Sequence, residues 1–226
     1  MVKNYTKNLL RRIKRLYIRN CLRVKKIITK DLSLSESYNL NDIWINEGNI
    51  NQIPKQVELI KKIIKGGNIN SVLEIGFNAG YSAELFLNNT SMDIVSFDDG
   101  RHEYHKFGKL HIDKNFPNRH SLILGDSKKT LLEYIISNPT KNFDLIFIDG
   151  GHDYNTAESD LLNCKNLSHK NTIVIMDDTV YKKEMICEWN IGPTNVWKKA
   201  VEKKIIKEIS KIEFDRGRGM SWGRYS

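Results

Sequence analysis

Short apolar runs alternate with segments of helical periodicity through most of this 226-residue sequence. The runs are Ser71–Ile75, Asp93–Phe97, Ser121–Leu124, Phe143–Ile148 and Thr172–Met176. The helical segments between them are Ser82–Asn88, His102–Phe116, Lys128–Ser137 and Thr156–Leu167. Continuous apolar runs joined by helical crossovers are typical of parallel strands that are buried on both faces. The pattern therefore predicts an α/β domain built on a doubly wound, mostly parallel sheet.

Two further strands are expected at the end of the chain. Ile206–Phe214 and Met220–Tyr225 flank the glycine-rich Arg216–Gly219, which is the pattern of an antiparallel hairpin. A helix is expected near Asn195–Lys204, and another that begins at Pro54 and ends at Gly66-Gly67. We therefore predict a seven-stranded sheet with an antiparallel last strand, in one domain over residues 54–226.

The first thirty residues form a separate, basic segment. They contain eleven of the chain's 36 Lys and Arg residues and no acid, so the remaining chain has 25 basic and 27 acidic residues. Apolar residues recur at helical spacing, which predicts an amphipathic helical arm over residues 1–30. The arm could pack on its own domain or on a second subunit, bind an anionic membrane, contact nucleic-acid phosphates, or act as a mitochondrial-type presequence. Residues 31–53 are expected to be a connecting or lid segment, because Ser33, Ser35, Ser37 and Asn39 indicate a structural break.

Composition points to a protein of the cytoplasm. No stretch approaches the roughly 18–20 apolar residues of a membrane span, and the apolar residues at the start are interrupted by Lys and Arg, unlike those of a secretory signal. The three cysteines are Cys21, Cys164 and Cys187, an odd number without metal-ligand or redox spacing. Reduced thiols and a cytoplasmic location are therefore expected.

A glycine-bearing turn follows the first apolar run. The segment from Val72 to Ser82 reads VLEIGFNAGYS, which predicts a strand, a turn and the start of a helix. Gly76 and Gly80 would let the backbone approach a ligand closely, and the helix would offer free N–H groups to an anion. The spacing differs from the dinucleotide pattern G-x-G-x-x-G, which argues against NAD. A tight connection without a ligand is the alternative interpretation.

An acidic residue lies at the carboxyl end of every apolar run. The second run leads to Asp98-Asp99, where an acid can accept both hydroxyls of a ribose, and the third to Gly125-Asp126-Ser127, which suits an adenine edge. The fourth leads to Asp149-Gly150-Gly151-His152 and the fifth to Asp177-Asp178-Thr179. Because the carboxyl ends of parallel strands share one edge, these acids are expected to converge on a site.

With these motifs, residues 55–226 resemble the class I S-adenosylmethionine-dependent methyltransferases, which have a Rossmann-like fold. The resemblance implies that Glu74, Gly76, Asn78 and Gly80 hold the methionine part of the cofactor, that Asp98 binds the ribose, and that Asp126 and Ser127 contact the adenine. The last hairpin resembles that family's reversed seventh strand.

The segments Phe147–Tyr154 and Ile175–Thr179 more narrowly resemble the branches that methylate oxygen of small molecules and sugars. Several members of those branches bind a divalent cation through acids that match Asp149, Asp177 and Asp178, although some have Asp-Asn where this chain has Asp177-Asp178. Magnesium would suit such ligands and could lower the pKa of an acceptor hydroxyl. The alternative is that these acids only cap a helix or turn.

His152 is the candidate general base, because an imidazole titrates near neutrality and lies on the same loop as Asp149. A capping role is the alternative for His152. Tyr154, Trp189 and Trp197 could line an acceptor pocket, with a core position favoured for Trp197. The remaining histidines considered, which have no partner spacing, are expected to be solvated: His102, His105, His111 and His120.

We therefore expect an O-directed methyltransferase that uses S-adenosylmethionine and a divalent cation and acts on a small-molecule or sugar acceptor. The arm offers a route to a homo-oligomer. The alternatives are a nucleic-acid methyltransferase that is recruited by the basic arm, and a catalytically silent binding module with the same fold.

Overall fold

The computed structural model describes residues 32–41, 43, 45, 47–91, 93–214 and 217–226. It contains one seven-stranded sheet in the order β3-β2-β1-β4-β5-β7-β6. The strands from β1 to β5 are mutually parallel, and β7 is antiparallel to both of its neighbours. The strands are β1 Ser71–Ile75, β2 Asp93–Asp98, β3 His120–Leu124, β4 Phe143–Ile148, β5 Ser168–Asp177, β6 Ile206–Glu213 and β7 Gly219–Tyr225.

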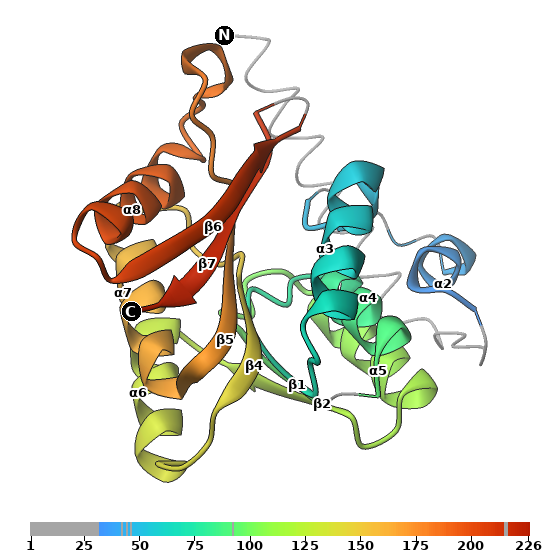
Figure 1. Cartoon of the computed structure of the whole chain (residues 1–226). Helices are drawn as coiled ribbons and strands as arrows, with labels where there is room; N and C mark the ends of the chain where they lie inside the picture. Colours follow the sequence, from blue (N-terminus) through green and yellow to red (C-terminus); the bar gives the residue numbers. More distant parts are fainter. Residues whose placement is uncertain (1–31, 42, 44, 46, 92, 215–216) are drawn as a thin grey trace, which may run out of the picture.

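Three helices cover each face of the sheet (Figure 1). One face carries α3 Pro54–Gly66, α4 Tyr81–Asn89 and α5 His105–Asn115. The other carries α6 Ser127–Ser137, α7 Tyr154–Cys164 and α8 Ile191–Glu202. The predicted doubly wound α/β fold with an antiparallel last strand is confirmed.

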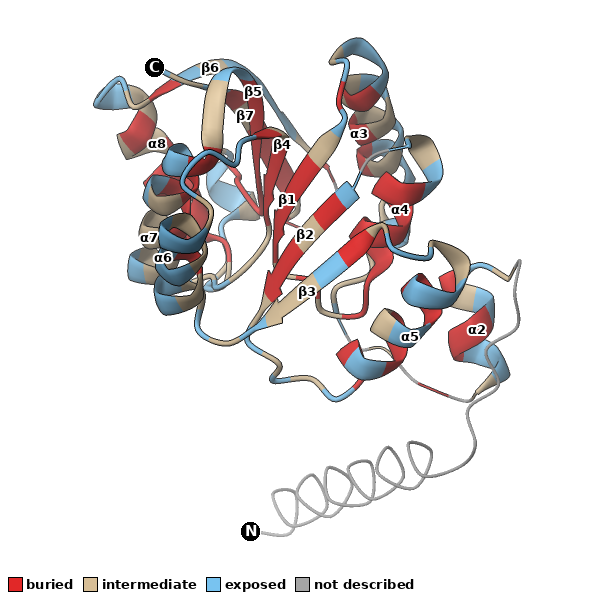
Figure 2. Cartoon of the chain, turned by 90° about the horizontal axis from the view of Figure 1, so that it is seen from below, coloured by how far each residue is buried: buried red, intermediate tan, exposed pale blue. Residues whose placement is uncertain are grey.

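The sheet is buried from both sides, so a hydrophobic core lies on each of its faces. Successive strand residues point to opposite faces: Val72 of β1 and Phe147 of β4 pack with α3, α4 and α5, whereas Leu73 and Ile146 of the same strands pack with α6, α7 and α8. Figure 2 shows the buried central strands between outer helix faces that are exposed. Burial on both faces is the physical reason for the continuous apolar runs in the sequence.

The boundaries of β1 and β4 lie where the sequence placed them, most of the others are shifted by at most three residues, and the starts of β5 and α8 are shifted furthest. β5 begins at Ser168, which pairs with Phe143 of β4 across an irregularity in the register, where the Thr172 hydroxyl donates to the Phe143 carbonyl (2.6 Å). α8 begins at Ile191, ahead of the expected Asn195, with Pro193 tolerated in its first turn.

The break expected before residue 44 is wrong for part of that segment, because Leu34–Leu40 forms a helix, α2. Ser33 and Glu36 form a reciprocal capping box at its start. The buried Tyr38 then fixes the helix to the domain, since its hydroxyl lies within hydrogen-bond distance of two carbonyl oxygens, those of Ala79 (2.9 Å) and Tyr104 (3.0 Å), and can donate its proton to either. The serines that indicated a break therefore include a helix cap.

Asp144 of β4 ties strands together near the amino end of β1. Its carboxylate accepts from the N–H groups of Asn70 (2.9 Å) and Ser71 (3.0 Å), and it lies 3.0 Å from Nε2 of His169. Burial raises the pKa of Asp144, but the hydrogen bonds from Asn70, His169 and Ser71 outweigh it and hold the pKa below its ordinary value. The ionised carboxylate therefore stabilises this end of the sheet.

The proposed basic arm, residues 1–30, lies outside the described residues. Within the described part of the chain, no helix is both long enough and apolar enough to cross a membrane.

Candidate active site

The carboxyl ends of β1, β2, β4 and β5 meet at one edge of the sheet. The chain continues from β1 to β2 on one side, while β4 lies against β1 on the other, so the strand order switches direction between β1 and β4. Open α/β sheets bind ligands in the crevice outside such a switch point. The residues that follow these strands are therefore the candidate site.

Gly76 brings the ends of β1 and β4 into backbone contact. Its φ is +96°, and a Cβ at this position would lie 2.0 Å from the carbonyl oxygen of Asp149. The two loops are further joined by the N–H of Asp149, which donates to the Ile75 carbonyl (2.8 Å). The close approach that requires glycine here is thus to the Asp149 backbone, and contact of Gly76 with a cofactor stays a prediction.

The turn between Gly76 and α4 is held in a left-handed conformation. Asn78 has φ +49° and Gly80 has φ +89°, and the N–H of Gly80 donates to the Phe77 carbonyl (2.8 Å). A Cβ on Gly80 would lie 2.8 Å from the Phe77 ring. The glycine therefore allows α4 to begin directly after a tight turn.

Asp98 is the side chain that the turn orients most directly. The N–H of Asn78 donates to one of its carboxylate oxygens (2.7 Å) and the N–H of Gly100 donates to the other (2.8 Å). Asp98 is half-buried at the end of β2, and each oxygen keeps a lone pair for another donor. A carboxylate fixed in this way could accept two hydroxyls of one sugar, and its contact with a ribose stays a prediction.

The Glu74 side chain is enclosed by the protein and does not face an open site. Its carboxylate is fully buried and accepts from the hydroxyls of Ser82 on α4 and Ser96 on β2, both at 2.5 Å. Burial raises the pKa of Glu74 to about 7, against the two serine hydrogen bonds that lower it. Glu74 therefore joins β1, β2 and the first turn of α4, which positions the glycine turn.

The expectation of solvated histidines is wrong for three of them. His105, His111 and His120 are buried, and His120 stacks on Phe77 and lies 2.9 Å from the Ser96 hydroxyl. Burial lowers the pKa of His120 to about 4, so the ring is neutral at physiological pH. His111 and His120 lie against partners from other elements, Glu84 and Ser96, which no periodic pattern marks, whereas His105 bonds to the nearby His102 carbonyl.

Asp126 and Ser127 lie at the start of α6, at the same edge as Asp98. Asp126 is exposed and caps the helix, with the N–H of Lys128 donating to its side chain (3.1 Å). The N–H of Gly125 donates to the Asp98 carbonyl (2.8 Å) and so joins the ends of β2 and β3. Both residues are positioned beside the ribose candidate, and their contact with adenine stays a prediction.

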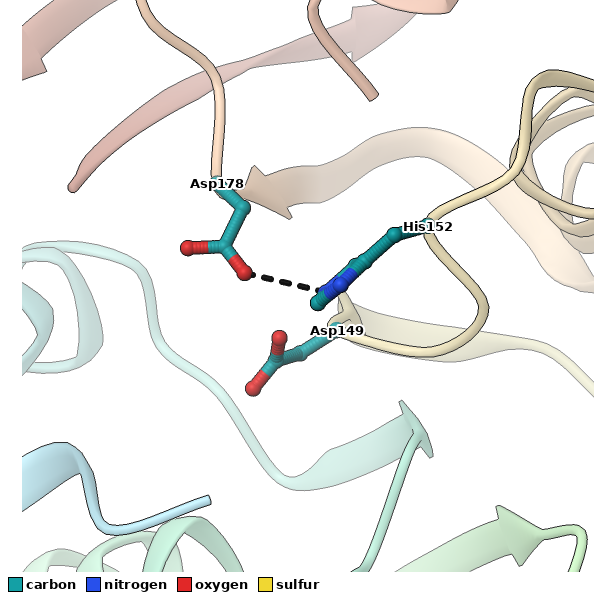
Figure 3. A group of neighbouring side chains, drawn as sticks. All are labelled: Asp149, His152 and Asp178. Carbon is teal, nitrogen blue, oxygen red and sulfur yellow. Dashed lines mark ion pairs between the residues drawn. The ribbon is translucent and has the colours of Figure 1, made fainter. Parts of the chain in front are cut away.

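On the other side of the switch point, Asp149, His152 and Asp178 point toward one another (Figure 3). One potential ligand atom from each lies within 4.8 Å of the others. Nε2 of His152 is 3.0 Å from a carboxylate oxygen of Asp178, and the other Asp178 oxygen is buried without a hydrogen-bond partner in the described chain. The structure thus brings the proposed base together with two of the three proposed cation ligands.

The third proposed ligand, Asp177, faces a different partner. Its two carboxylate oxygens lie 2.8 and 2.7 Å from Nε2 of Gln56 on α3, and one of them also accepts from the N–H of Asp178. Gln56 is buried at 2% exposure. Nothing in the sequence pattern singled it out, because a polar residue in the first turn of an amphipathic helix is ordinarily solvated.

Burial and neighbouring charges raise the pKa values of Asp149 and Asp177. Burial, followed by the charges of Asp177 and Asp178, raises the pKa of Asp149 well above its ordinary range, and burial raises that of Asp177 to about 7. The hydrogen bond to Asp178 raises the pKa of His152. Closely spaced buried acids favour a bound cation, which compensates their charge.

Of the aromatic residues considered for an acceptor pocket, only Trp189 lies beside this group, with its ring centroid 6.1 Å from that of His152. Trp197 is fully buried in the core, as favoured, and its indole N–H donates to Glu208 (2.7 Å). Tyr154 packs between α7 and α8, where its hydroxyl bonds Glu158 and accepts from Lys199.

Comparison with protein families matches residues 73–179, slightly less than half of the chain, to a family described as a methyltransferase domain. The matched segment begins within β1 and ends just past Asp178, so it contains the glycine turn, Asp98 and the acidic group. Comparison with curated proteins gives no match.

Solved structures of methyltransferases share the fold. An O-methyltransferase from Bacillus cereus in complex with SAH is 18% identical with a TM-score of 0.68, over 92% of this chain and 97% of that one. The O-methyltransferase TomG from Streptomyces achromogenes, involved in tomaymycin synthesis and solved with SAM, is 15% identical with a TM-score of 0.68, over 88% and 92%. An SAH-bound methyltransferase from Podospora anserina is 16% identical with a TM-score of 0.63, over 96% of both chains.

The likeness to these structures establishes the fold. The family match covers the residues that follow the carboxyl ends of its parallel strands. The chain therefore has the class I methyltransferase fold, and its segment from β1 to the end of β5 matches a methyltransferase domain.

Proposed function

We propose that this protein transfers the methyl group of S-adenosylmethionine to a hydroxyl oxygen of a small molecule or sugar, assisted by a divalent cation. The observation that carries the proposal is the position of Asp98 and of the Asp149–His152–Asp178 group on the two sides of one switch point. Cofactor and acceptor sites would then adjoin, as in-line methyl transfer requires. The similar O-methyltransferases solved with SAM and SAH support the same assignment.

For the cofactor, Asp98 would accept the ribose hydroxyls and Asp126 and Ser127 would adjoin the adenine. Gly76, Asn78 and Gly80 would form the wall along the methionine part, supported from behind by Glu74. The sulfonium of the bound cofactor supplies an electrophilic methyl group. An acceptor oxygen forms the new bond to this methyl carbon while the carbon–sulfur bond breaks, and the sulfur keeps the electron pair.

The residues near His152 fit a divalent cation. Asp149 and Asp178 offer hard carboxylate oxygens, which Mg²⁺ prefers, and one buried Asp178 oxygen is without a hydrogen-bond partner in the described chain. Asp177 would complete the set, with Gln56 orienting its carboxylate. A cation in this position would lower the pKa of an acceptor hydroxyl.

We assign removal of the proton from the acceptor hydroxyl to His152. Nε2 of its ring is directed to Asp178, which leaves Nδ1 for the acceptor. A carboxylate partner stabilises the imidazolium that forms when the ring takes a proton. His152 would therefore act as the base and Asp178 would orient it.

The test is turnover of labelled S-adenosylmethionine with a panel of hydroxylated acceptors, in Mg²⁺ and in EDTA. We expect an O-methylated product whose formation stops in EDTA, while SAH still binds. Full turnover in EDTA, with Asp149→Asn still inactive, would show that these acids work without a cation. A product methylated on nitrogen or carbon would contradict the assignment to oxygen.

A further inference from the structure

An arginine and a tryptophan stand next to His152 and have no part in the chemistry described above. Arg218 lies at the start of β7, and Trp189 lies in the segment before α8. The guanidinium carbon of Arg218 is 5.2 Å from the centroid of the Trp189 ring, and one guanidinium nitrogen is 3.7 Å from Asp178. The pair therefore borders the proposed acceptor site.

A buried amide sets the position of this pair. The side chain of Asn190 is fully buried, and its Nδ2 donates to the carbonyl oxygens of Gly217 and Met185, both at 2.9 Å. Its Oδ1 accepts from the N–H of Cys187 (2.8 Å). The residues adjacent to Arg218 and Trp189 are thus joined through a satisfied buried group, which specifies one arrangement of the two backbones.

The hydrogen-bonding edge of Arg218 is unused. Its side chain is 38% exposed, and the 3.7 Å separation from Asp178 is too long for a hydrogen bond. No hydrogen bond from the guanidinium to any described residue is present. Trp189 occupies one face of the guanidinium, so the planar fork of N–H donors remains free to bind an anion.

In this site the acidic side chains lie deep in the protein and the basic side chains lie nearer the surface. Asp177 and Asp178 are buried, at 4% and 2% exposure, whereas His152 and Arg218 are more than a third exposed in their side chains. An acceptor whose hydroxyl reached Asp149 and His152 would leave its outer part against Trp189 and Arg218. Repulsion from the acids would be smallest for an anionic group at this outer position.

We propose that the acceptor carries a carboxylate, which binds the free edge of Arg218 while the adjoining part of the molecule packs on Trp189. The guanidinium fork matches a carboxylate in a bidentate manner. This inference rests on the proposed function for the place of the acceptor hydroxyl. It narrows the acceptor to hydroxy acids, either aromatic acids or sugar acids.

The test uses two probes of nearly the same shape, 3,4-dihydroxybenzoate and 3,4-dihydroxybenzamide, of which only the first has a negatively charged carboxylate. Their binding to the full chain is measured by calorimetry with saturating SAH and Mg²⁺. We expect the carboxylate to bind about tenfold more tightly or better, the effect of one charge-assisted contact. In Arg218→Gln the two probes should bind alike, and Arg218→Lys should keep part of the preference. Arg224→Gln, at the other end of β7, is the matched control and should keep all of it.

Equal affinities in the unaltered protein, or a preference that survives Arg218→Gln, would overturn the proposal. So would the absence of binding of both probes. Titration of SAH into the same samples distinguishes failure of the carboxylate assignment from failure of the proposed function. If SAH binds and the probes show no preference, the carboxylate assignment alone fails; if SAH does not bind, the proposed function fails with it.

Discussion

The substitution Asp98→Asn tests the cofactor site through its best-defined side chain. The structure gives the Asp98 carboxylate two backbone donors, one on each oxygen. The asparagine amide has only one oxygen, so its NH₂ group must face a backbone N–H or turn away. The change therefore removes the charge and disturbs the orientation of the remaining acceptor.

The expected loss of SAH affinity follows from the hydrogen bonds that the substitution removes. A hydrogen bond to a charged group contributes about 1.5–3 kcal/mol net. Loss of one such bond to a ribose hydroxyl corresponds to a fall in affinity of about ten- to a hundredfold. We expect this fall in the dissociation constant for SAH, measured by calorimetry on protein whose melting curve confirms that it is folded.

Asp99→Asn is the matched control. Asp99 is the next residue, is 44% exposed in its side chain, and pairs with Arg101. It has the same charge, but its carboxylate accepts from Arg101 instead of from the turn. Unchanged SAH affinity in folded Asp98→Asn would show that the ribose is placed wrongly, and an equal loss in both variants would indicate only a general effect of charge.

Three further predictions concern other parts of the chain. Asp144→Asn should lower the free energy of unfolding at pH 7 by about 1–2 kcal/mol, because charge-assisted hydrogen bonds are lost. The pKa of Asp144 is depressed in the folded protein, so this difference in unfolding free energy should be present above the unfolded pKa, which is near 4, and should disappear as the pH falls through the folded pKa. Denaturation at several pH values measures the difference, and a difference independent of pH would refute the prediction. His152→Ala should lose about 10²–10⁴-fold in turnover at unchanged SAH affinity, and a loss below tenfold would remove it as the base. Deletion of residues 1–30 should change melting temperature or oligomeric state but keep SAH binding; loss of binding in a folded, unchanged assembly would show that the arm completes the active site.

The sequence was sufficient for the features that depend on local pattern. β1 and β4 have the predicted bounds because strands that are buried on both faces are mostly apolar along their length. The acids after each strand converge because parallel strands share one carboxyl edge. The same reasoning brought Asp149 and Asp178 together with His152.

The residues that the sequence did not reveal come from other elements and follow no period. Gln56 reaches Asp177 from a helix that lies 121 residues earlier in the chain, and Asn190 joins two loops through a buried amide. Gly76 was expected to make room for a ligand, whereas the structure places the Asp149 backbone there. Such contacts depend on how the loops pack, which no local pattern encodes.

The central claim is that S-adenosylmethionine binds across the carboxyl ends of β1, β2 and β3, next to the acidic group. A crystal structure of the full chain with SAH measures this directly. The account predicts that the ribose hydroxyls contact Asp98, with the adenine beside Asp126 and Ser127 and the sulfur directed toward Asp149 and His152. SAH bound elsewhere, or no SAH in crystals grown at saturating concentration, would contradict it.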